Sequence, residues 1–306
     1  MHAAILRYLE TVAREGSIRK AAERLNISAS AINRQILKLE YEFGTPLFER
    51  RPNGMALTES GRLAVAHARD TLASFERLKG EVDALRGIVS GVVTINTLDS
   101  LAVQFLPETL AQFNAAHPTV EIRVLSCDPG VVIQNVAQGE ADIGLTFGQR
   151  MRVGVKVLHD IPCALCAIMT PDHPLADRSQ LTLGECAAYP MVSQDNIGSM
   201  QRFFGDEMDR FKRTKTPVLT SNTLALLKRL ILRGVGIAFY TRLGFAEELA
   251  AGRLKAIPLT DDRLASLRLS LIVSSERSPT IAAKTMADHM RDALARFSVG
   301  LDGGGK

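Results

Sequence analysis

Residues 17–43, which read SIRKAAERLNISASAINRQILKLEYEF, decide the fold of the N-terminal part. The stretch predicts two short helices, residues 18–25 and 29–43, joined by a tight turn. Ser17 and Ser28 directly precede these helices, where a serine side chain accepts a hydrogen bond from an amide of the first turn. The pattern is typical of a helix-turn-helix, whose second helix enters the major groove of DNA.

The two faces of the second helix differ in chemistry. One face repeats apolar side chains at helical spacing and is expected to be buried: Ile32, Ile36, Leu39 and Phe43. The other face contains no acid: Ser30, Asn33, Arg34, Leu37 and Tyr41. A surface with donors and a cation but no carboxylate can lie against DNA without repelling phosphate. An ordinary pair of antiparallel helices shows the same pattern, so the flanking sequence has to support DNA binding.

The flanking sequence predicts a winged domain. A helix over residues 3–15 precedes the motif, and residues 47–57 favour a β-hairpin whose Asn53-Gly54 pair suits the turn. The expected DNA contacts are Ser28, Ala29, Ser30, Asn33, Arg34, Lys38, Arg50, Arg51 and Asn53. Asn33 and Ser30 would meet base edges, and the cations would hold phosphates or the minor groove. A solvated hairpin with incidental arginines is the alternative for the wing.

A long helix follows Thr58 and extends to about residue 86. Its apolar side chains alternate steps of three and four residues, with one break: Val65, Ala68, Leu72, Phe75, Leu78, Val82 and Leu85. Such a seam suits packing along a partner helix and predicts a dimer. Packing within the first domain is the alternative. Gly87 and Ser90-Gly91 supply a hinge.

The composition is that of an ordinary globular protein of two or three domains, with 306 residues, 46% of them hydrophobic, and a net charge of +4. Most of the positive excess lies before residue 88. Neither an export signal nor a long apolar span is recognisable, so we expect a cytoplasmic protein that does not enter membranes. Cys163 and Cys166 form a CxxC in an apolar, strand-like run that points them to opposite faces, so buried thiols are more plausible than redox or metal chemistry. We expect no cofactor.

From residue 91 onward, strands and helices alternate, which predicts an α/β fold with parallel strands. The first strands are expected at residues 92–97, 120–126 and 141–147, with helices at 100–116 and 129–138 between them. A second α/β unit follows, with strands near 163–170, 190–193, 218–220 and 236–240 and helices near 201–211, 222–233 and 243–251. A last strand at 267–275 and a last helix at 280–297 close the chain.

Several motifs resemble those of the LysR-type transcriptional regulators. In the first part they are Ala21-Ala22-Glu23-Arg24-Leu25, Ser30-Ala31-Ile32, Leu39-Glu40, Pro46-Leu47-Phe48-Glu49-Arg50 and Leu57-Thr58. In the second part they are Leu106-Pro107, Gly139-Glu140-Ala141-Asp142-Ile143-Gly144-Leu145, His173-Pro174-Leu175 and Val235-Gly236-Ile237-Ala238. Asn33 and Ala29-Ser30 depart from the usual family residues, so the resemblance does not give the operator sequence.

The resemblance implies a winged helix-turn-helix at residues 1–58, a linker helix and hinge at 59–90, and an effector domain at 91–300. That domain would have two lobes like a periplasmic binding protein, with residues 91–160 and 266–300 in lobe I and residues 161–265 in lobe II. The resemblance also implies a tetramer built from two dimers, and an inducer in the cleft between the lobes.

Ligands of open α/β lobes bind outside the carboxyl ends of strands, near helix N-termini. The expected effector contacts are Thr97, Ser100, Leu101, Thr146, Phe147, Ser193, Asn196, Asn222 and Thr223. Free amides and hydroxyls at these places would suit a carboxylate or another small anion. The alternative is that these residues only cap helices, as Ser and Asn commonly do.

Three other functions are weaker. An enzyme is disfavoured because the sequence has no glycine-rich phosphate loop, no GxSxG and no HExxH, and its six histidines are scattered. A transporter's solute-binding protein would need an export signal and would not need residues 17–57. A winged-helix protein that bends DNA without sensing a small molecule remains as the runner-up.

Overall fold

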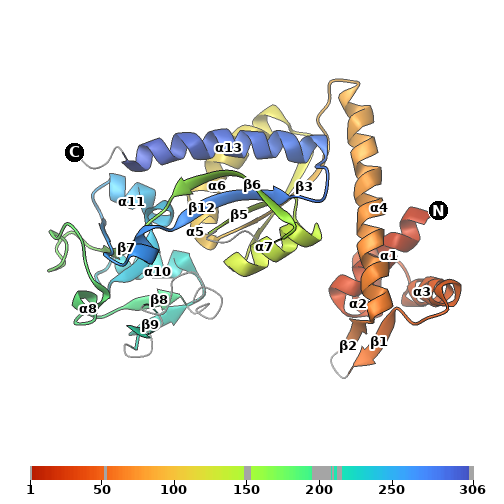
Figure 1. Cartoon of the computed structure of the whole chain (residues 1–306), viewed down its shortest axis with the longest axis horizontal. Helices are drawn as coiled ribbons and strands as arrows, with labels where there is room; N and C mark the ends of the chain where they lie inside the picture. The colour runs from red at the N-terminus through yellow and green to blue at the C-terminus, as the bar shows by residue number, and fades with distance from the viewer. Residues whose placement is uncertain are drawn as a thin grey trace. The chain divides into compact units, whose positions relative to one another are not determined.

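The computed structural model describes residues 2–51, 54–147, 153–194, 208, 210–211 and 216–302. The chain divides into two compact units, Met1–Ile88 and Val89–Lys306. The first unit contains α1 (His2–Glu15), α2 (Ile18–Leu25), α3 (Ala29–Phe43), the hairpin β1 (Phe48–Arg51) and β2 (Gly54–Leu57), and α4 (Glu59–Ala84) (Figure 1). The predicted mixed α/β fold with a winged helix-turn-helix is confirmed.

Local capping sets the limits of α2 and α3, which agree with the predicted helices. The Ser17 hydroxyl accepts a hydrogen bond from the Lys20 amide, and the Ser28 hydroxyl accepts one from the Ala31 amide at 3.2 Å. Gly44 ends α3 in the left-handed region with φ 66°. These interactions involve residues at most four positions apart, which is why the sequence alone located the helix ends.

The core of the first unit lies between α1, α2, α3 and the start of α4. Its buried apolar residues are Leu9, Val12, Ala21, Ala22, Ile32, Ile36, Leu47, Phe48, Val65 and Ala68. The prediction that Phe43 is buried is wrong, because its side chain is 58% exposed. Phe43 lies in the last turn of α3, beyond the small core that Ile32 and Ile36 reach. Leu39 is only partly buried.

The long helix α4 changes character along its length. Val65 and Ala68 are buried in the core of the first unit, whereas Phe75, Leu78 and Val82 are 48%, 55% and 47% exposed. At its beginning α4 passes so close to the wing that a Cβ on Gly61 would lie 1.9 Å from the carbonyl oxygen of Leu47. The first half of α4 therefore packs within the unit, as one alternative for the seam predicts. The apolar side chains of the second half are exposed in this chain.

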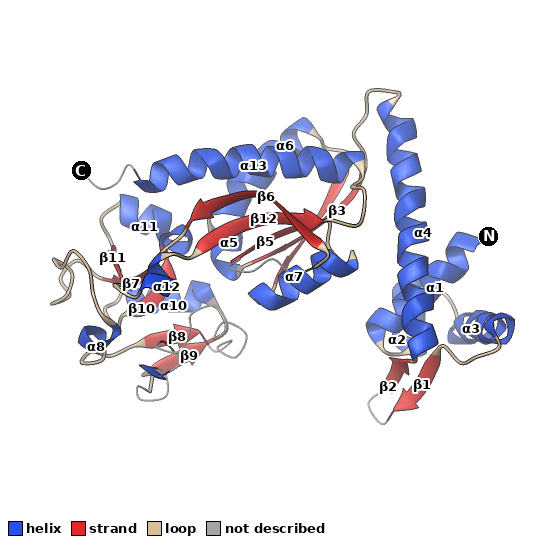
Figure 2. Cartoon of the chain, viewed as in Figure 1, coloured by secondary structure: helices blue, strands red, loops and turns tan. Residues whose placement is uncertain are grey.

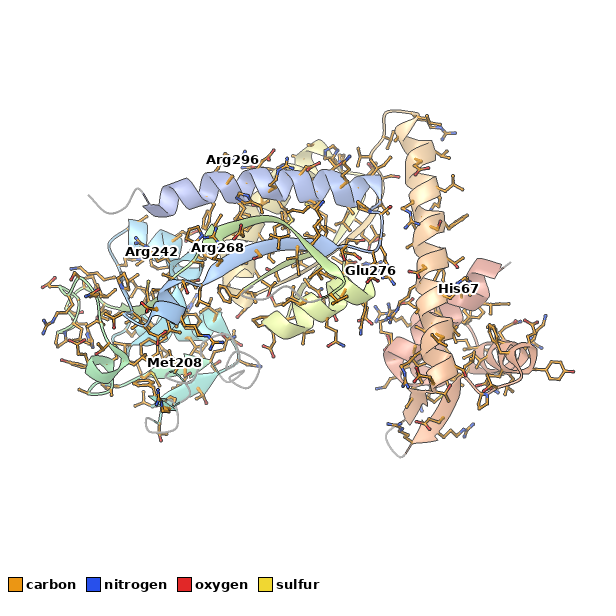
Figure 3. The ribbon with its side chains drawn as sticks, in the orientation of Figure 1. His67, Met208, Arg242, Arg268, Glu276 and Arg296 are labelled. Atoms are coloured by element: carbon orange, nitrogen blue, oxygen red, sulfur yellow. The ribbon has the colours of Figure 1, made fainter. Side chains whose placement is uncertain are left out.

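The larger sheet of the second unit has the strand order β4-β3-β5-β12-β6. Its strands are β3 (Gly91–Thr97), β4 (Val120–Ser126), β5 (Ile143–Phe147), β6 (Val155–Pro162) and β12 (Arg268–Ser274). β3 is parallel to β4 and β5, as predicted, but β12 is antiparallel to β5 and β6. β6 was not predicted, and its cross-strand partner is more than a hundred residues away in sequence. Arg268 of β12 forms an ion pair with Asp160 of β6 (Figure 3).

Helices cover both faces of this sheet (Figure 2). They are α5 (Asp99–Val103), α6 (Phe105–Ala116), α7 (Pro129–Gln138) and α13 (Ile281–Asp302). α6 and α13 pack with the sheet in one apolar cluster, and α7 packs on the other face in a second cluster. The helix predicted at residues 100–116 is broken at Gln104, which has φ −126° and ψ −49°.

The second lobe holds the shorter strands and helices. The strands are β7 (Leu165–Met169), β8 (Val192–Gln194), β9 (Leu219–Ser221), β10 (Ala238–Thr241) and β11 (Lys255–Pro258). The helices are α8 (Leu183–Cys186), α10 (Leu224–Ile231), a 3-10 turn (Arg242–Phe245), α11 (Ala246–Ala250) and α12 (Asp262–Ala265). β8 and β9 pair in parallel, but β10 and β11 flank β7 in antiparallel order, so the parallel prediction is wrong for that sheet.

The chain passes between the lobes twice, and the two connecting segments lie side by side. The Cys163 amide in one segment donates a hydrogen bond to the Leu267 carbonyl oxygen in the other at 2.8 Å. Cys163 and Cys166 are buried in different apolar clusters, which agrees with the prediction that they point to opposite faces. Most of the helix predicted near residues 201–211 lies outside the described residues. No helix among the residues described is long and apolar enough to cross a membrane.

Candidate DNA interface and effector cavity

The exposed face of α3 presents the predicted polar surface. Ser28, Ala29, Ser30 and Arg34 are exposed and Asn33 is half-buried. The Ser28 and Ser30 hydroxyls lie 3.2 Å apart and share a hydrogen bond, so one of the two protons remains available to a ligand at the start of the helix. Within the described part of the chain, Arg34 makes no hydrogen bond or ion pair, and its guanidinium is available to an incoming phosphate.

A carboxylate joins this face one turn further along. Lys38 Nζ lies 3.9 Å from Glu42 Oε1, and both side chains are more than half exposed. The acid-free surface therefore covers the first turns of α3 but does not extend past Lys38. An exposed pair of this kind is weak and would compete only modestly with a DNA phosphate.

The two arginines of the wing also differ in whether their side chains have an internal partner. Both are exposed, but Arg51 Nε donates to Glu49 Oε1 at 3.0 Å, whereas Arg50 has no such partner among the residues that the structure describes. Asn53, which was predicted to contact DNA, lies outside the described residues.

One carboxylate ties the recognition helix to the wing. Glu40 Oε1 accepts hydrogen bonds from the Leu47 amide at 2.8 Å and from the Phe48 amide at 3.2 Å. Sequence reasoning noted Glu40 only as part of a family motif and did not assign this role. Because the acceptor and the amides lie seven and eight residues apart, only the folded chain shows that the wing begins at a place set by α3.

A cavity of about 320 Å³ lies in the second unit, with walls from both lobes. The first lobe contributes Leu98, Asp99, Ser100, Ser126, Cys127, Asp128, Pro129 and Phe147. The second lobe contributes Leu165, Met191, Val192, Ser193, Gln194, Met208, Asn222, Phe239, Tyr240 and Thr241. Figure 3 labels Met208 in that lobe. The size is at the small end of ordinary ligand sites.

The predicted effector residues divide into those that line this cavity and those that do not. Ser100, Phe147, Ser193 and Asn222 line it. Thr97, Leu101 and Thr146 do not: they are fully buried in the first lobe. Thr223 is exposed at the start of α10 and is also absent from the wall, and Asn196 lies outside the described residues.

Hydrogen bonding explains why the two buried threonines do not reach the cavity. The Thr146 hydroxyl donates to the Pro129 carbonyl oxygen at 3.2 Å, and the Thr97 hydroxyl donates to the Leu98 carbonyl oxygen at 3.4 Å. Both hydroxyls therefore donate to backbone carbonyl oxygens of their own lobe. Ser100 is placed differently, because it lies against the second lobe. A Cβ added to Gly244 of that lobe would lie 3.1 Å from the Cβ of Ser100, so α5 meets the second lobe at this residue.

Sequence reasoning missed several wall residues. Cys127 and Asp128 follow the carboxyl end of β4, and the rule applied to the first and third strands would have found them there. Phe239 and Tyr240 could not be found in this way, because they lie within β10, whose antiparallel partner was not recognised.

Asp99 connects the lobes. Its Oδ2 accepts a hydrogen bond at 3.0 Å from the amide of Leu224, at the start of α10 in the second lobe. Burial raises the pKa of the nearby Tyr240, and the negative charge of Asp99 raises it further, so the phenol stays protonated. The Tyr240 hydroxyl donates to Gln194 Oε1 at 3.4 Å.

The thiols show no sign of activation. Burial, and then the charge of Asp128, raises the pKa of Cys127 in the cavity wall. Burial raises the pKa of Cys163 to about 12 and that of Cys166 to about 11. Thiolates are the reactive form of cysteine, so the raised pKa values keep these side chains in the less reactive thiol form. In the described residues, no cluster of three His, Cys, Asp or Glu side chains is arranged to hold a metal ion.

Known proteins share both units. Residues 4–62 match the model of the bacterial regulatory helix-turn-helix protein, lysR family, and residues 86–295 match that of the LysR substrate binding domain. The HTH-type transcriptional regulator CbbR of Rhizobium meliloti is 29% identical over 84% of this chain and 82% of its own length.

Two solved structures have the same fold. Full-length OxyR of Pseudomonas aeruginosa, in a variant form, covers 96% of this chain and 94% of its own, with a TM-score of 0.67 at 17% identity. Full-length CbnR in complex with its target DNA covers 96% of this chain and 100% of its own, with a TM-score of 0.58 at 19% identity. Together with the winged helix-turn-helix and the two-lobed unit, the matches show that this chain belongs to the LysR family of transcriptional regulators.

Proposed function

We propose that this regulator binds DNA through α3 and the wing, and that a small-molecule effector in the cavity between the lobes controls its activity. The observation that carries the proposal is the cavity itself, since side chains of both lobes form its wall. A molecule held there contacts both lobes at once. It can favour one lobe arrangement over another, to the extent that it binds the two with different affinity.

On DNA, Asn33 and Ser30 would contact base edges, and Ser28, Ala29, Arg34, Lys38, Arg50, Arg51 and Asn53 would complete the surface. Arg34 and Arg50 are exposed and Asn33 is half-buried. Such side chains can meet a duplex without first breaking an internal contact. We assign the cations to phosphates or the minor groove and Asn33 to adenine.

We further propose that two chains pair along the second half of α4, and that two dimers form a tetramer. The exposed side chains of Phe75, Leu78, Val82 and Leu85 support the dimer, because their spacing of three and four residues makes one apolar stripe. Pairing would place two recognition helices about 34 Å apart on one side of the duplex.

The sequence also predicts a carboxylate effector, on the argument that free helix N-termini attract anions. Of these predictions, the carboxylate effector receives the least support from the geometry. Asp99 already accepts from the first amide of α10, and α7 begins with Pro129, which has no amide hydrogen to donate. The carboxylate therefore stays a prediction from the sequence.

The experiment is selection of bound fragments from the genomic DNA of the source organism by the purified full-length protein, followed by sequencing. We expect enrichment of a short symmetric sequence. Asn33→Ala should relax the preference at one position of each half, with a loss of about 1–3 kcal/mol at that base. The matched control is Asn114→Ala, an exposed position on α6 in the other unit. No enrichment at low salt would refute DNA recognition, and an unchanged preference in Asn33→Ala would remove Asn33 from base reading.

A further inference from the structure

The cavity wall is negatively charged where the structure describes it. Asp99 and Asp128 belong to the wall, and none of its described residues is Lys, Arg or His. The remaining polar groups are neutral. An anionic effector would meet two carboxylates and no compensating cation in this part of the wall. The charges of the described wall residues therefore disfavour the carboxylate effector that the sequence predicts.

The two carboxylates differ in how far they are already satisfied. Asp99 accepts the Leu224 amide at 3.0 Å, so the partial positive charge at the N-terminus of α10 already offsets part of its charge. Asp128 stands at the N-cap position of α7, where the helix N-terminus also offsets part of its charge, but its side chain makes no capping hydrogen bond there. It is half-buried, and the described residues give it no ion-pair partner. Asp128 is therefore the acceptor that a ligand would meet.

The rest of the wall suits an apolar body with a polar end. Phe147, Leu165, Met191 and Phe239 supply apolar surface from both lobes. Tyr240 adds a partly buried aromatic ring whose hydroxyl donates a hydrogen bond to Gln194. A ligand with an apolar group and a polar end would find both apolar surface and the Asp128 carboxylate in the same wall.

We propose that the effector is an organic cation of modest size, with a protonated amine that binds the Asp128 carboxylate and an apolar portion that fills the interlobe cavity. The inference rests on the proposed function, since it takes this cavity as the effector site. A protonated amine donates charge-assisted hydrogen bonds, which are about twice as strong as neutral ones. In a partly desolvated cavity such a bond discriminates strongly between cations and anions.

The test compares probes of one shape and different charge: 2-phenylethylamine, 2-phenylethanol and 3-phenylpropionate. Binding to the full-length protein is measured by isothermal titration calorimetry and by the shift in Tm. We expect the amine to bind most tightly and the carboxylate least. Asp128→Asn keeps the side-chain shape but removes the charge, and should weaken the amine about tenfold or more. The same variant should leave the alcohol unchanged and improve the carboxylate.

Glu121→Gln is the matched control, because Glu121 is an exposed acid on β4 that pairs with Arg123 and does not belong to the cavity wall. It should leave all three affinities unchanged. The proposal is overturned if the carboxylate binds the unmodified protein as well as the amine does, or if Asp128→Asn leaves the amine affinity unchanged. It is also overturned if the amine produces no binding heat and no Tm shift at about 10 mM, a concentration that would detect even millimolar affinity.

A second measurement separates this inference from the proposed function. The affinity for the selected DNA is measured with and without each probe. If the amine binds in an Asp128-dependent way but leaves the DNA affinity unchanged, the cavity takes organic cations and the proposed effector control fails. If instead a carboxylate alters DNA binding, effector control stands and the cationic class is rejected.

Discussion

Glu40 on the recognition helix accepts a hydrogen bond from the backbone amide of Leu47, at the start of the wing, over a distance of 2.8 Å. The same oxygen accepts the Phe48 amide, and both residues are buried. One carboxylate thus ties the recognition helix to the start of the wing.

Glu40→Ala removes this acceptor and leaves two amides without it. We expect a loss of about 1–3 kcal/mol in the stability of the first unit, because a buried donor loses its partner. Amide hydrogen exchange at Leu47 and Phe48 should accelerate, and DNA affinity should fall because the wing is no longer fixed. Glu42→Ala, an exposed acid on the same helix, is the control. Equal exchange rates in both variants would show that Glu40 does not position the wing.

Arg34→Ala and Lys38→Ala should differ in their effect on DNA binding. Arg34 enters the complex without an internal partner in the described chain, whereas Lys38 begins near Glu42. Arg34→Ala should weaken binding to all sequences and lower the salt slope by about 1. Lys38→Ala should have the smaller effect on both. Fluorescence anisotropy over a salt series measures the slopes, and a larger change for Lys38→Ala would contradict this assignment.

Leu78→Lys combined with Val82→Lys places two charges in the exposed stripe of α4. We expect the dimer to dissociate at micromolar concentration, because a charge buried in an apolar seam must lose its hydration. Sedimentation velocity measures the mass. Leu226→Lys on α10, also an exposed leucine, is the control and should keep the assembly of the unmodified protein. A mass that the double substitution leaves unchanged would place the interface elsewhere.

Lys228 and Glu248 form a buried ion pair at 3.0 Å, with side chains 10% and 8% exposed. Gln104 of the first lobe also donates to Glu248, at 3.1 Å. Lys228→Met should destabilise the second unit by about 3–5 kcal/mol, since Glu248 would stay buried without its main partner. Adding Glu248→Gln should recover much of that loss. Urea denaturation followed in the full-length protein tests both, and additive losses would argue against a coupled pair.

Asp142 should make stability depend on pH. Burial raises the pKa of its carboxyl group, although the hydrogen bond from the Thr94 amide at 2.8 Å opposes that rise. An acid whose folded pKa is raised contributes stability below its unfolded pKa and loses that contribution as pH rises through the folded pKa. Asp142→Asn keeps an oxygen for Thr94 and should therefore raise Tm at pH 7, with a gain that shrinks toward about pH 4.

Asp177→Asn provides the opposite case. The hydrogen bond and charge of Lys255 lower the pKa of this exposed carboxyl, so its contribution is present at neutral pH and is lost on acidification. The substitution should not raise Tm at pH 7. A Tm for Asp142→Asn below that of the unmodified protein at pH 7 would mean that the hydrogen bond outweighs burial.

Short-range signals account for what could be predicted in the first unit. The serine caps and the left-handed Gly44 act within a few residues, so the limits of α2 and α3 were readable. The exposure of Phe43 could not be predicted in this way. Helical spacing shows which side chains share a face of the helix, but it does not show how far the core extends along that face. The same limit applies to α4, where one periodic stripe is buried at one end and exposed at the other.

The candidate DNA surface was therefore largely determined by the sequence by itself. Its residues lie on one short helix and one hairpin, and the helix period places Ser30, Asn33 and Arg34 on a common face. The tertiary structure decided which cations have internal partners, as Lys38 does near Glu42, and that Glu40 fixes the wing.

The interlobe cavity was decided mainly by the tertiary structure. Local patterns pointed to Ser100, Phe147, Ser193 and Asn222, which line the cavity, because strand ends and helix starts line such clefts. They could not separate these residues from Thr97 and Thr146, whose hydroxyls turn back to the backbone, nor find Tyr240, whose antiparallel strand pairs with a distant β7. Pairing between strands far apart in sequence leaves no periodic trace in either strand, so the charge and shape of the cavity exist only once both lobes are folded.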